Sequence, residues 1–349
     1  METHTSSNTK TKLFLDFASA TKPFRKIIEA SSTKTPNAIK VLEQLPQDQG
    51  TSLGNAADML LTLTEGLTSL PDLPTRKGTL SSASLSTTTK LWTANCTTKN
   101  DAGEESQLQV HSPLLVLCTG SAPTPPYLPI ALPKGLTPLF LDTALQPSIL
   151  KQHISPEQTT TIAIIGASHS AILCLMNLSN LAMTSHPNLH IKWFTRHPLR
   201  YAEYRDGWIL RDNTGLKGEA ATWARENLEE ETFESSPVSK FIEKITYKRE
   251  DENTTFEKHL PGCDKYVAAI GYTKNPLPRL ERDGEVLGPV FNHETGGFSN
   301  GEEGENINGL FGAGIAFPER VVDPEGNVEY AVGFWKFVKF VKRVSPGWN

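Results

Sequence analysis

An apolar run near the middle of the chain ends at a single glycine. Residues Thr161–Ile165 are β-branched or alanine, Gly166 follows them, and Ala167–Ala171 have the pattern of a helix start. Such a strand brings the backbone to a tight turn that a phosphate can approach closely, because glycine has no Cβ. The N-terminus of the following helix offers unpaired N–H groups and a partial positive charge. The run therefore predicts an α/β unit that binds a dinucleotide.

Length and composition limit what surrounds this unit. A chain of 349 residues has room for about two domains of ordinary size. With 38% hydrophobic and 21% charged residues, its composition is that of an ordinary globular protein. The net charge of −5 gives no general basic field, so we expect a small-molecule substrate and no nucleic-acid partner.

The cysteines and the apolar runs indicate the compartment. Cys96, Cys118, Cys174 and Cys263 are widely spaced, without a CxxC or metal-type pair, so we expect no metal site and reduced, mostly buried thiols. The first residues lack the pattern of a signal peptide, and no run reaches the ~18 apolar residues of a membrane span. We expect a cytoplasmic protein without a transmembrane segment.

Three further apolar strands end in glycine turns. The strand Leu114–Leu117 runs into Thr119-Gly120, Tyr266–Ile270 runs into Gly271, and a third strand ends at Gly312-Ala313-Gly314. Each turn alone is weak evidence of a ligand site. Their distribution around the central turn is a more specific signal.

With these turns the chain resembles the flavoproteins that have two dinucleotide-binding domains, a superfamily that includes flavin-dependent monooxygenases and disulfide oxidoreductases. Cys118-Thr119-Gly120 and Ala269-Ile270-Gly271 look like the two crossover turns between the domains. Gly312-Ala313-Gly314 is similar to the late Gly-Asp motif beside the flavin, although the Asp is missing.

The resemblance implies the fold class α/β, with a Rossmann-like NAD(P)-binding domain inserted into a partial FAD/NAD(P)-binding domain. It covers roughly residues 87–349. The implied domains are a divergent or truncated N-terminal region over 1–86, a discontinuous FAD-type domain over 87–158 and 264–349, and an inserted NADPH-binding domain over 159–263.

The implied activity is that of an FAD- and NADPH-dependent oxidoreductase. Because the chain has no CxxC or CxxxxC pair, disulfide reduction is disfavoured and a monooxygenase-like reaction on a small organic substrate is favoured. The alternative is a flavin-free pseudoenzyme or binding protein that retains the fold. No catalytic side chain is assigned.

Two departures from the family pattern bear on the cofactors. No GxGxxG turn occurs before residue 87, so the main phosphate anchor for FAD is not found there. The central turn reads Gly-Ala-Ser-His-Ser-Ala and keeps only the first glycine of the fingerprint. Ser168 can still donate a hydrogen bond to a phosphate oxygen, whereas the alternative is a structural turn that binds nothing.

We therefore expect FAD to bind more weakly than in a family member with the intact anchor, and the protein to be largely colourless after purification. The flavin would lose several N–H contacts and the field of a helix terminus together. The measurement is the visible spectrum after gel filtration. A stoichiometric yellow complex would contradict this expectation and reveal a different phosphate site.

The second strand of the central unit indicates which nicotinamide cofactor binds. Residues 190–195 have the pattern of that strand, and Arg196 follows where an NAD site has an acidic residue for the ribose 2′-OH. A guanidinium suits a 2′-phosphate, so NADPH is expected, with Arg200 close by. The alternative is that both arginines lie on a solvated loop. The expected cofactor-binding residues are Gly166, Ala167, Ser168, His169, Ser170 and Arg196 and, at the other turns, Thr119, Gly120, Gly271, Gly312, Ala313 and Gly314.

Two other segments have open interpretations. Residues 201–224 are rich in polar and aromatic side chains and form either a pocket or, as we favour, a surface loop before a helix. Residues 332–343 predict an amphipathic helix, which either packs on the FAD-type domain, as we favour, or lies on a membrane surface. His169 is expected to bond locally rather than to catalyse.

Overall fold

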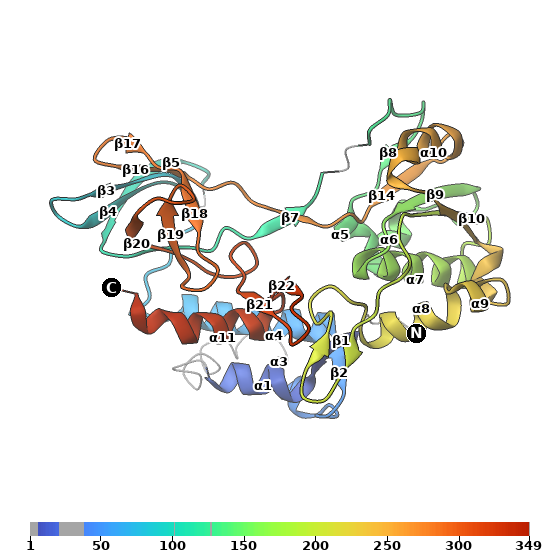
Figure 1. Cartoon of the computed structure of the whole chain (residues 1–349), viewed down its shortest axis with the longest axis horizontal. Coiled ribbons are helices and arrows are strands. Elements are labelled where there is room, and N and C mark those ends of the chain that lie inside the picture. The colour runs from blue at the N-terminus through green and yellow to red at the C-terminus, as the bar shows by residue number, and fades with distance from the viewer. Residues whose placement is uncertain (1–5, 21–37, 101, 126–127, 349) are drawn as a thin grey trace. The chain divides into compact units, whose positions relative to one another are not determined.

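The structure is a computed structural model that describes residues 6–20, 38–100, 102–125 and 128–348 (Figure 1). The chain divides into two compact units. Among the described residues, unit 1 comprises 6–10, 49–54, 123–125 and 128–273, and unit 2 comprises 11–20, 38–48, 55–100, 102–122 and 274–348. The chain passes between the units at β7 (Ser121–Pro123) and β15 (Tyr272–Lys274), which pair with each other.

Unit 1 is built on a five-stranded parallel sheet. The strand order is β13 (Ile242–Thr246), β10 (Leu189–Thr195), β9 (Thr160–Ile165), β14 (Lys265–Ala268) and β8 (Thr137–Pro138). In this register Ile165 lies beside Phe194 on one side and Ala268 on the other. The carboxyl ends of the three central strands therefore meet at one edge of the sheet.

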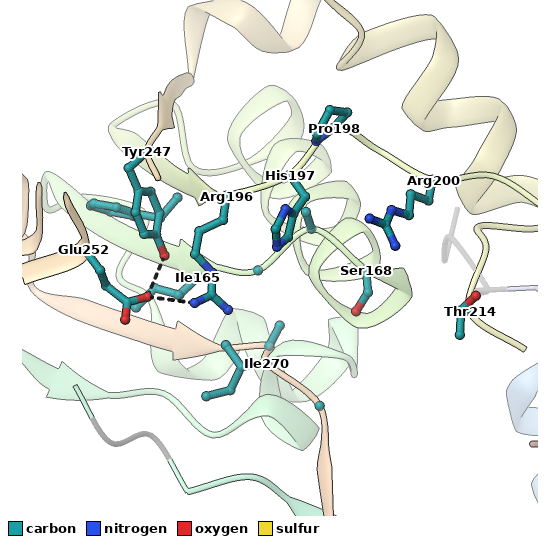
Figure 2. A pocket seen from close by; sticks show the side chains of 15 residues that line it. Ile165, Ser168, Arg196, His197, Pro198, Arg200, Thr214, Tyr247, Glu252 and Ile270 are labelled. Atoms are coloured by element: carbon teal, nitrogen blue, oxygen red, sulfur yellow. Dashed lines mark hydrogen bonds and ion pairs between the residues drawn. The ribbon is translucent and has the colours of Figure 1, made fainter. Parts of the chain in front are cut away.

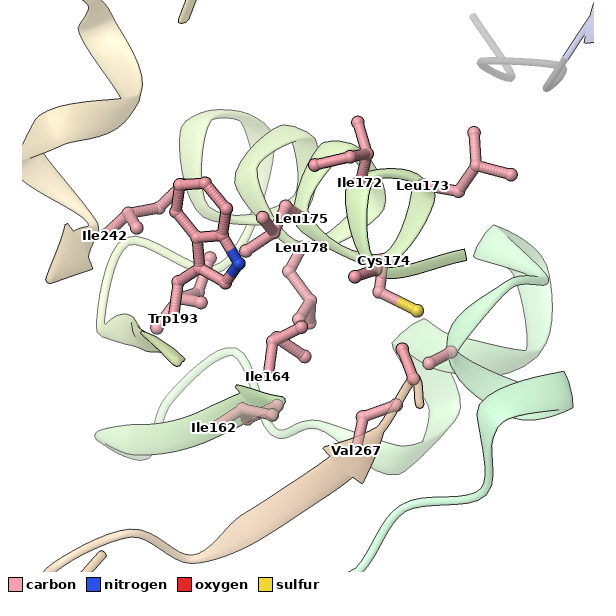
Figure 3. Close-up of a cluster of buried hydrophobic side chains, with 14 of the residues drawn as sticks. Ile162, Ile164, Ile172, Leu173, Cys174, Leu175, Leu178, Trp193, Ile242 and Val267 are labelled. Carbon is pink, nitrogen blue, oxygen red and sulfur yellow. The ribbon is translucent and has the colours of Figure 1, made fainter. Parts of the chain in front are cut away.

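Both faces of this sheet are covered, which explains why β9 is apolar at every position from Ile162 to Ile165. Ile162 and Ile164 pack toward α7 (His169–Thr184), as Figure 3 shows, while Ala163 and Ile165 belong to the cluster on the other face. Successive side chains of a strand point to opposite faces, so a strand buried on both sides has no polar alternation. The prediction of a buried strand followed by a helix is confirmed.

The other face of the sheet is covered by α10 (Glu252–His259), whose Phe256 packs edge-on against Phe194 and Tyr247. The remaining regular elements of unit 1 are mostly short. They are α5 (Leu141–Ala144), α6 (Pro147–Leu150), α8 (Gly218–Asn227), α9 (Glu230–Phe233) and the pairs β1 (Ser6–Lys10) with β2 (Gly50–Ser52) and β11 (Glu203–Tyr204) with β12 (Ile209–Leu210).

Unit 2 contains two larger sheets. The first has the order β17 (Glu285–Val286), β16 (Arg279–Arg282), β3 (Gly78–Ser86), β4 (Leu91–Lys99) and β5 (Glu105–Ser112). The second has the order β18 (Pro289–Phe291), β19 (Gly297–Asn300), β20 (Asn306–Gly312) and β6 (Leu115–Leu117). Residues 91–96 and 107–110 have strand patterns separated by a turn-prone segment, which predicts a hairpin. This hairpin is present as β4 and β5, and Asn100 Oδ1 holds its turn by accepting hydrogen bonds from two backbone N–H groups.

Helices complete unit 2. These are α1 (Thr11–Ala20), α3 (Ala38–Glu43), most of α4 (Leu53–Thr68) and α11 (Phe334–Val344), together with the pair β21 (Arg320–Val322) and β22 (Val328–Tyr330). The predicted C-terminal helix is present as α11, where Phe340 is buried and Arg343 Nη2 lies 2.6 Å from Glu319 Oε1. No helix in the described ranges is long and apolar enough to cross a bilayer.

Some expectations differ from the structure. Residues 78–86 are not part of a separate N-terminal region, since β3 pairs with β4 and β16 in unit 2. The strand before Gly271 does not join the sheet that contains Leu115–Leu117; it pairs with β9, because its buried apolar residues complete the central sheet of unit 1. Unit 1 thus takes in residues on both sides of the range 159–263 that the resemblance implies, together with 6–10 and 49–54.

Two smaller differences concern the helix in residues 53–68 and the thiols. The apolar pattern of residues 55–63 predicts a helix that ends near Gly66. The helix continues to Thr68, which is consistent with the modest cost of one glycine in a helix. The expectation of mostly buried cysteines holds only for Cys174 and Cys263, since Cys118 is exposed and Cys96 is half-buried.

Candidate functional site

A cavity of about 310 Å³ lies in unit 1 at the carboxyl ends of β9, β10 and β14 (Figure 2). Three turns line it: residues 166–168 after β9, residues 196–200 after β10, and residues 269–271 after β14. In open parallel sheets this edge is where ligands bind, because the turns there leave a crevice outside the strand ends. The sequence prediction therefore coincides with a real cavity.

Gly166 is required by the geometry of the first turn. Its φ is +130°, and a Cβ on it would lie 2.3 Å from the carbonyl oxygen of Ala269. The turn is held by backbone hydrogen bonds from Gly166 N to Phe194 O, 3.0 Å, and from Ala269 N to Ile165 O, 2.8 Å. The buried indole of Trp193 donates to the Gly166 carbonyl at 2.8 Å. The glycine thus brings the ends of β9 and β14 together.

The N-terminus of α7 opens beside this turn. Ser168 is the N-cap residue, with extended backbone and no side-chain capping bond, and its exposed hydroxyl lines the cavity. The first N–H groups of a helix have no acceptor within the helix, so they are available to an anion.

The two residues after Ser168 do not line the cavity. His169 is half-buried, and burial together with Lys217 lowers the pKa of its imidazole. The hydroxyl of Ser170 hydrogen-bonds to the phenol of Tyr272. Of the predicted stretch, Gly166, Ala167 and Ser168 therefore line the cavity.

Arg196 begins the turn after β10 and has an acidic neighbour. Its Nη1 lies 3.4 Å from Glu252 Oε1, which also accepts a hydrogen bond of 3.3 Å from the hydroxyl of Tyr247. Figure 2 shows the Glu252 carboxylate between these two groups. Burial, followed by Glu252, raises the pKa of Tyr247 to about 12, so this phenol stays protonated and donates to the carboxylate at neutral pH.

Two further basic side chains border the cavity, those of His197 and Arg200. Neither side chain has a hydrogen bond or ion pair with any residue that the structure describes. With two guanidinium groups against the carboxylate of Glu252, the charged side chains around the cavity carry a net positive charge. The arrangement suits a phosphate-bearing ligand.

The remaining predicted residues, apart from Gly271 in the cavity, lie in unit 2. Strands β6 and β20 run parallel, so their glycine turns lie at the same edge of that sheet. Ala313 N donates to Leu117 O at 3.0 Å, and Asn275 Nδ2 donates to Thr119 O at 2.8 Å. The structure thus brings the Thr119-Gly120 turn and the Ala313-Gly314 turn to one place.

These turns have distinct local features. Thr119 Oγ1 is buried and has no hydrogen-bond partner in the described part of the chain. A Cβ on Gly312 would lie 2.6 Å from the ring of Phe317, so this glycine is a packing requirement. Gly314 has a φ of +83° with open space around it, and Gly120 has a φ of +71°. The turns are therefore open where backbone groups can meet a ligand.

Sequence reasoning missed Tyr247 and Glu252. They follow β13, the strand beside β10, and therefore reach the same sheet edge as Arg196. In β13 only Ile242 and Ile245 are apolar, so the sequence offers no alternation that marks this strand. The described residues hold no group of histidine, cysteine and acidic side chains arranged to bind a metal.

Comparison with known proteins identifies the family. No family model matches the chain. Monooxygenase AgnR1 from Paecilomyces divaricatus is 51% identical over 342 residues, which cover 98% of this chain and 86% of AgnR1.

Two solved structures are also similar, at lower identity. One is KtzI, the ornithine N-hydroxylase of Kutzneria sp. 744, with a TM-score of 0.48 and 12% identity over 88% of this chain and 80% of that chain. The other is DfoA bound to FAD, a cadaverine monooxygenase from Erwinia amylovora, with a TM-score of 0.41 and 14% identity over 98% of this chain and 71% of that chain. The family assignment rests on AgnR1 alone.

The relative confirms the predicted class, an oxidoreductase of the monooxygenase type. The identity to AgnR1 extends over both units, so it is not confined to one dinucleotide-binding motif. This protein belongs to the same family as the monooxygenase AgnR1.

Proposed function

We propose that this protein is a monooxygenase that uses NADPH and FAD to act on a small organic substrate. NADPH binds in the cavity of unit 1, and FAD binds at the β6 and β20 turns of unit 2. The observation that carries the proposal is the cavity itself, which combines a close-approach glycine, a helix N-terminus and two arginines at one sheet edge.

In unit 1 the parts of NADPH match different residues. The pyrophosphate lies against the N-terminus of α7, where the Ser168 hydroxyl and the first helical N–H groups donate to its oxygens. The 2′-phosphate lies against the guanidinium groups of Arg196 and Arg200. The residue directly after β10 is Arg196 rather than an acidic residue, which favours NADPH over NADH.

The turns of unit 2 fit a flavin cofactor. The unpartnered hydroxyl of Thr119 needs a polar partner that the described residues do not supply, and Gly120 and Gly314 leave backbone space beside it. When bound at these residues, NADPH would supply the reducing equivalents and FAD would supply the oxygen chemistry. The residues of this chain then serve to bind and orient the two rings and to keep the turns rigid.

Replacing Thr119 by valine tests the flavin site. We expect the Kd for FAD to rise about 5- to 10-fold, which is the effect of losing one hydrogen bond to a ligand. Stability without FAD is expected to be unchanged or slightly higher, because valine removes a buried hydroxyl without a partner. Both quantities follow from flavin fluorescence titration and thermal denaturation.

Thr79→Val is the matched control, since Thr79 lies exposed on β3 of the same unit. We expect this variant to bind FAD like the parent protein. If Thr119→Val left the FAD affinity unchanged, the β6 and β20 turns would not be the flavin site.

A further inference from the structure

Glu252 is the acidic side chain among the described residues that line the cavity, and its charge opposes a phosphate. It begins α10, and its carboxylate lies within 3.4 Å of the Arg196 guanidinium that we assign to the 2′-phosphate. Both side chains are partly exposed, Glu252 at 26% and Arg196 at 36%. A bound 2′-phosphate would therefore meet a negative charge as well as a positive one.

The carboxylate is held in this place from two sides. Tyr247 donates a hydrogen bond to the same oxygen that faces Arg196, and Tyr247 is itself buried against Phe256 of α10. A held carboxylate cannot turn away from an incoming anion as a fully solvated one can. It can, however, accept a hydrogen bond from a ribose 2′-OH, which is how acidic residues recognise NADH.

We propose that Glu252 is a specificity-determining residue, whose carboxylate limits the preference of this cavity for NADPH over NADH. The inference rests on the proposed NADPH site and deepens it. Arg196 attracts the 2′-phosphate, Glu252 opposes it, and the preference for NADPH reflects the balance of the two charges.

The test is Glu252→Gln, which retains an oxygen for Tyr247 and for Arg196, removes the negative charge and replaces the second oxygen by an amide NH2 group. The probes are adenosine 2′,5′-bisphosphate and adenosine 5′-monophosphate, titrated by calorimetry, so that the readout does not depend on flavin or activity. We expect the bisphosphate to bind about 5- to 10-fold more tightly to the variant, and the monophosphate affinity to change by less than about 2-fold. The gain should shrink at high salt.

Two controls separate charge from structure. Glu250→Gln removes the same charge from an exposed position two residues earlier, outside the cavity, and Tyr247→Phe removes a hydrogen bond but keeps the carboxylate. Glu250→Gln should leave the ratio of the two affinities within about 2-fold, whereas Tyr247→Phe, which frees the carboxylate to turn away, should shift the ratio in the same direction as Glu252→Gln but by less.

The outcomes are distinguishable. Suppose that the parent protein binds the bisphosphate, but that Glu252→Gln lowers the affinity for the bisphosphate or changes the affinities for both probes by the same factor. Glu252 then only positions Arg196, and the specificity role is overturned. If Tyr247→Phe changes the ratio as much as Glu252→Gln does, the effect is structural and the role is again overturned. If the parent protein binds neither probe, the NADPH site itself fails, and this inference fails with it.

Discussion

Arg196→Ala is expected to weaken NADPH binding about 10- to 100-fold, because a charge-assisted contact to the 2′-phosphate contributes about 1.5–3 kcal/mol. The substitution also leaves the Glu252 carboxylate without its cation neighbour, so the phosphate would meet an uncompensated negative charge. NADH has no 2′-phosphate, so its affinity for the variant should fall by less than about 3-fold. The measurement is the Kd of each cofactor by calorimetric titration.

The control for this prediction is Arg249→Ala. Arg249 is exposed in the same unit and does not line the cavity, so its removal tests the general effect of one positive charge. Equal losses of NADPH and NADH affinity in Arg196→Ala would show that Arg196 does not recognise the 2′-phosphate.

Gly166→Ala is expected to lower the free energy of unfolding by about 3 to 5 kcal/mol and to abolish NADPH binding. A Cβ would lie 2.3 Å from the Ala269 carbonyl oxygen, and a φ of +130° is strained for alanine whatever the space. The ends of β9 and β14 would have to separate, which disturbs the turn that meets the pyrophosphate. Urea denaturation measures the stability.

Gly262→Ala is the matched control. Gly262 also has a positive φ, +85°, but no atom lies within 4 Å of its Cβ position, so only the conformational cost of about 1–2 kcal/mol applies. If Gly166→Ala cost no more than Gly262→Ala, the close approach of the two strand ends would not limit this fold.

The sequence predicted the central strand, turn and helix because their signals are local. Residues 162–165 are all apolar, without the alternation of a strand that has one exposed face, which indicates burial on both faces. Gly166 has a conformational requirement that only glycine meets. Arg196 was found for the same reason, since it directly follows the next strand along the chain.

The rest of the site depends on contacts between distant segments. Glu252 and Tyr247 reach the cavity only because β13 pairs beside β10, and no local pattern specifies that pairing. The range of unit 1 differs from the expected domain for a similar reason. The strand that contains Val267 ends near a glycine, as β6 and β20 of unit 2 do, yet Val267 is buried in the core of unit 1 and its strand pairs with β9. Periodicity indicates burial but not the sheet in which a strand is buried.

Anaerobic addition of NADPH to the purified protein with excess FAD tests the central claim most directly. We expect the flavin absorbance near 450 nm, an approximate figure for the cofactor itself, to disappear in the presence of the protein and to return when oxygen is admitted. NADPH should act at lower concentrations than NADH. If the flavin spectrum changed no faster with the protein than in its absence, the chain would not be the NADPH- and FAD-dependent monooxygenase that we propose.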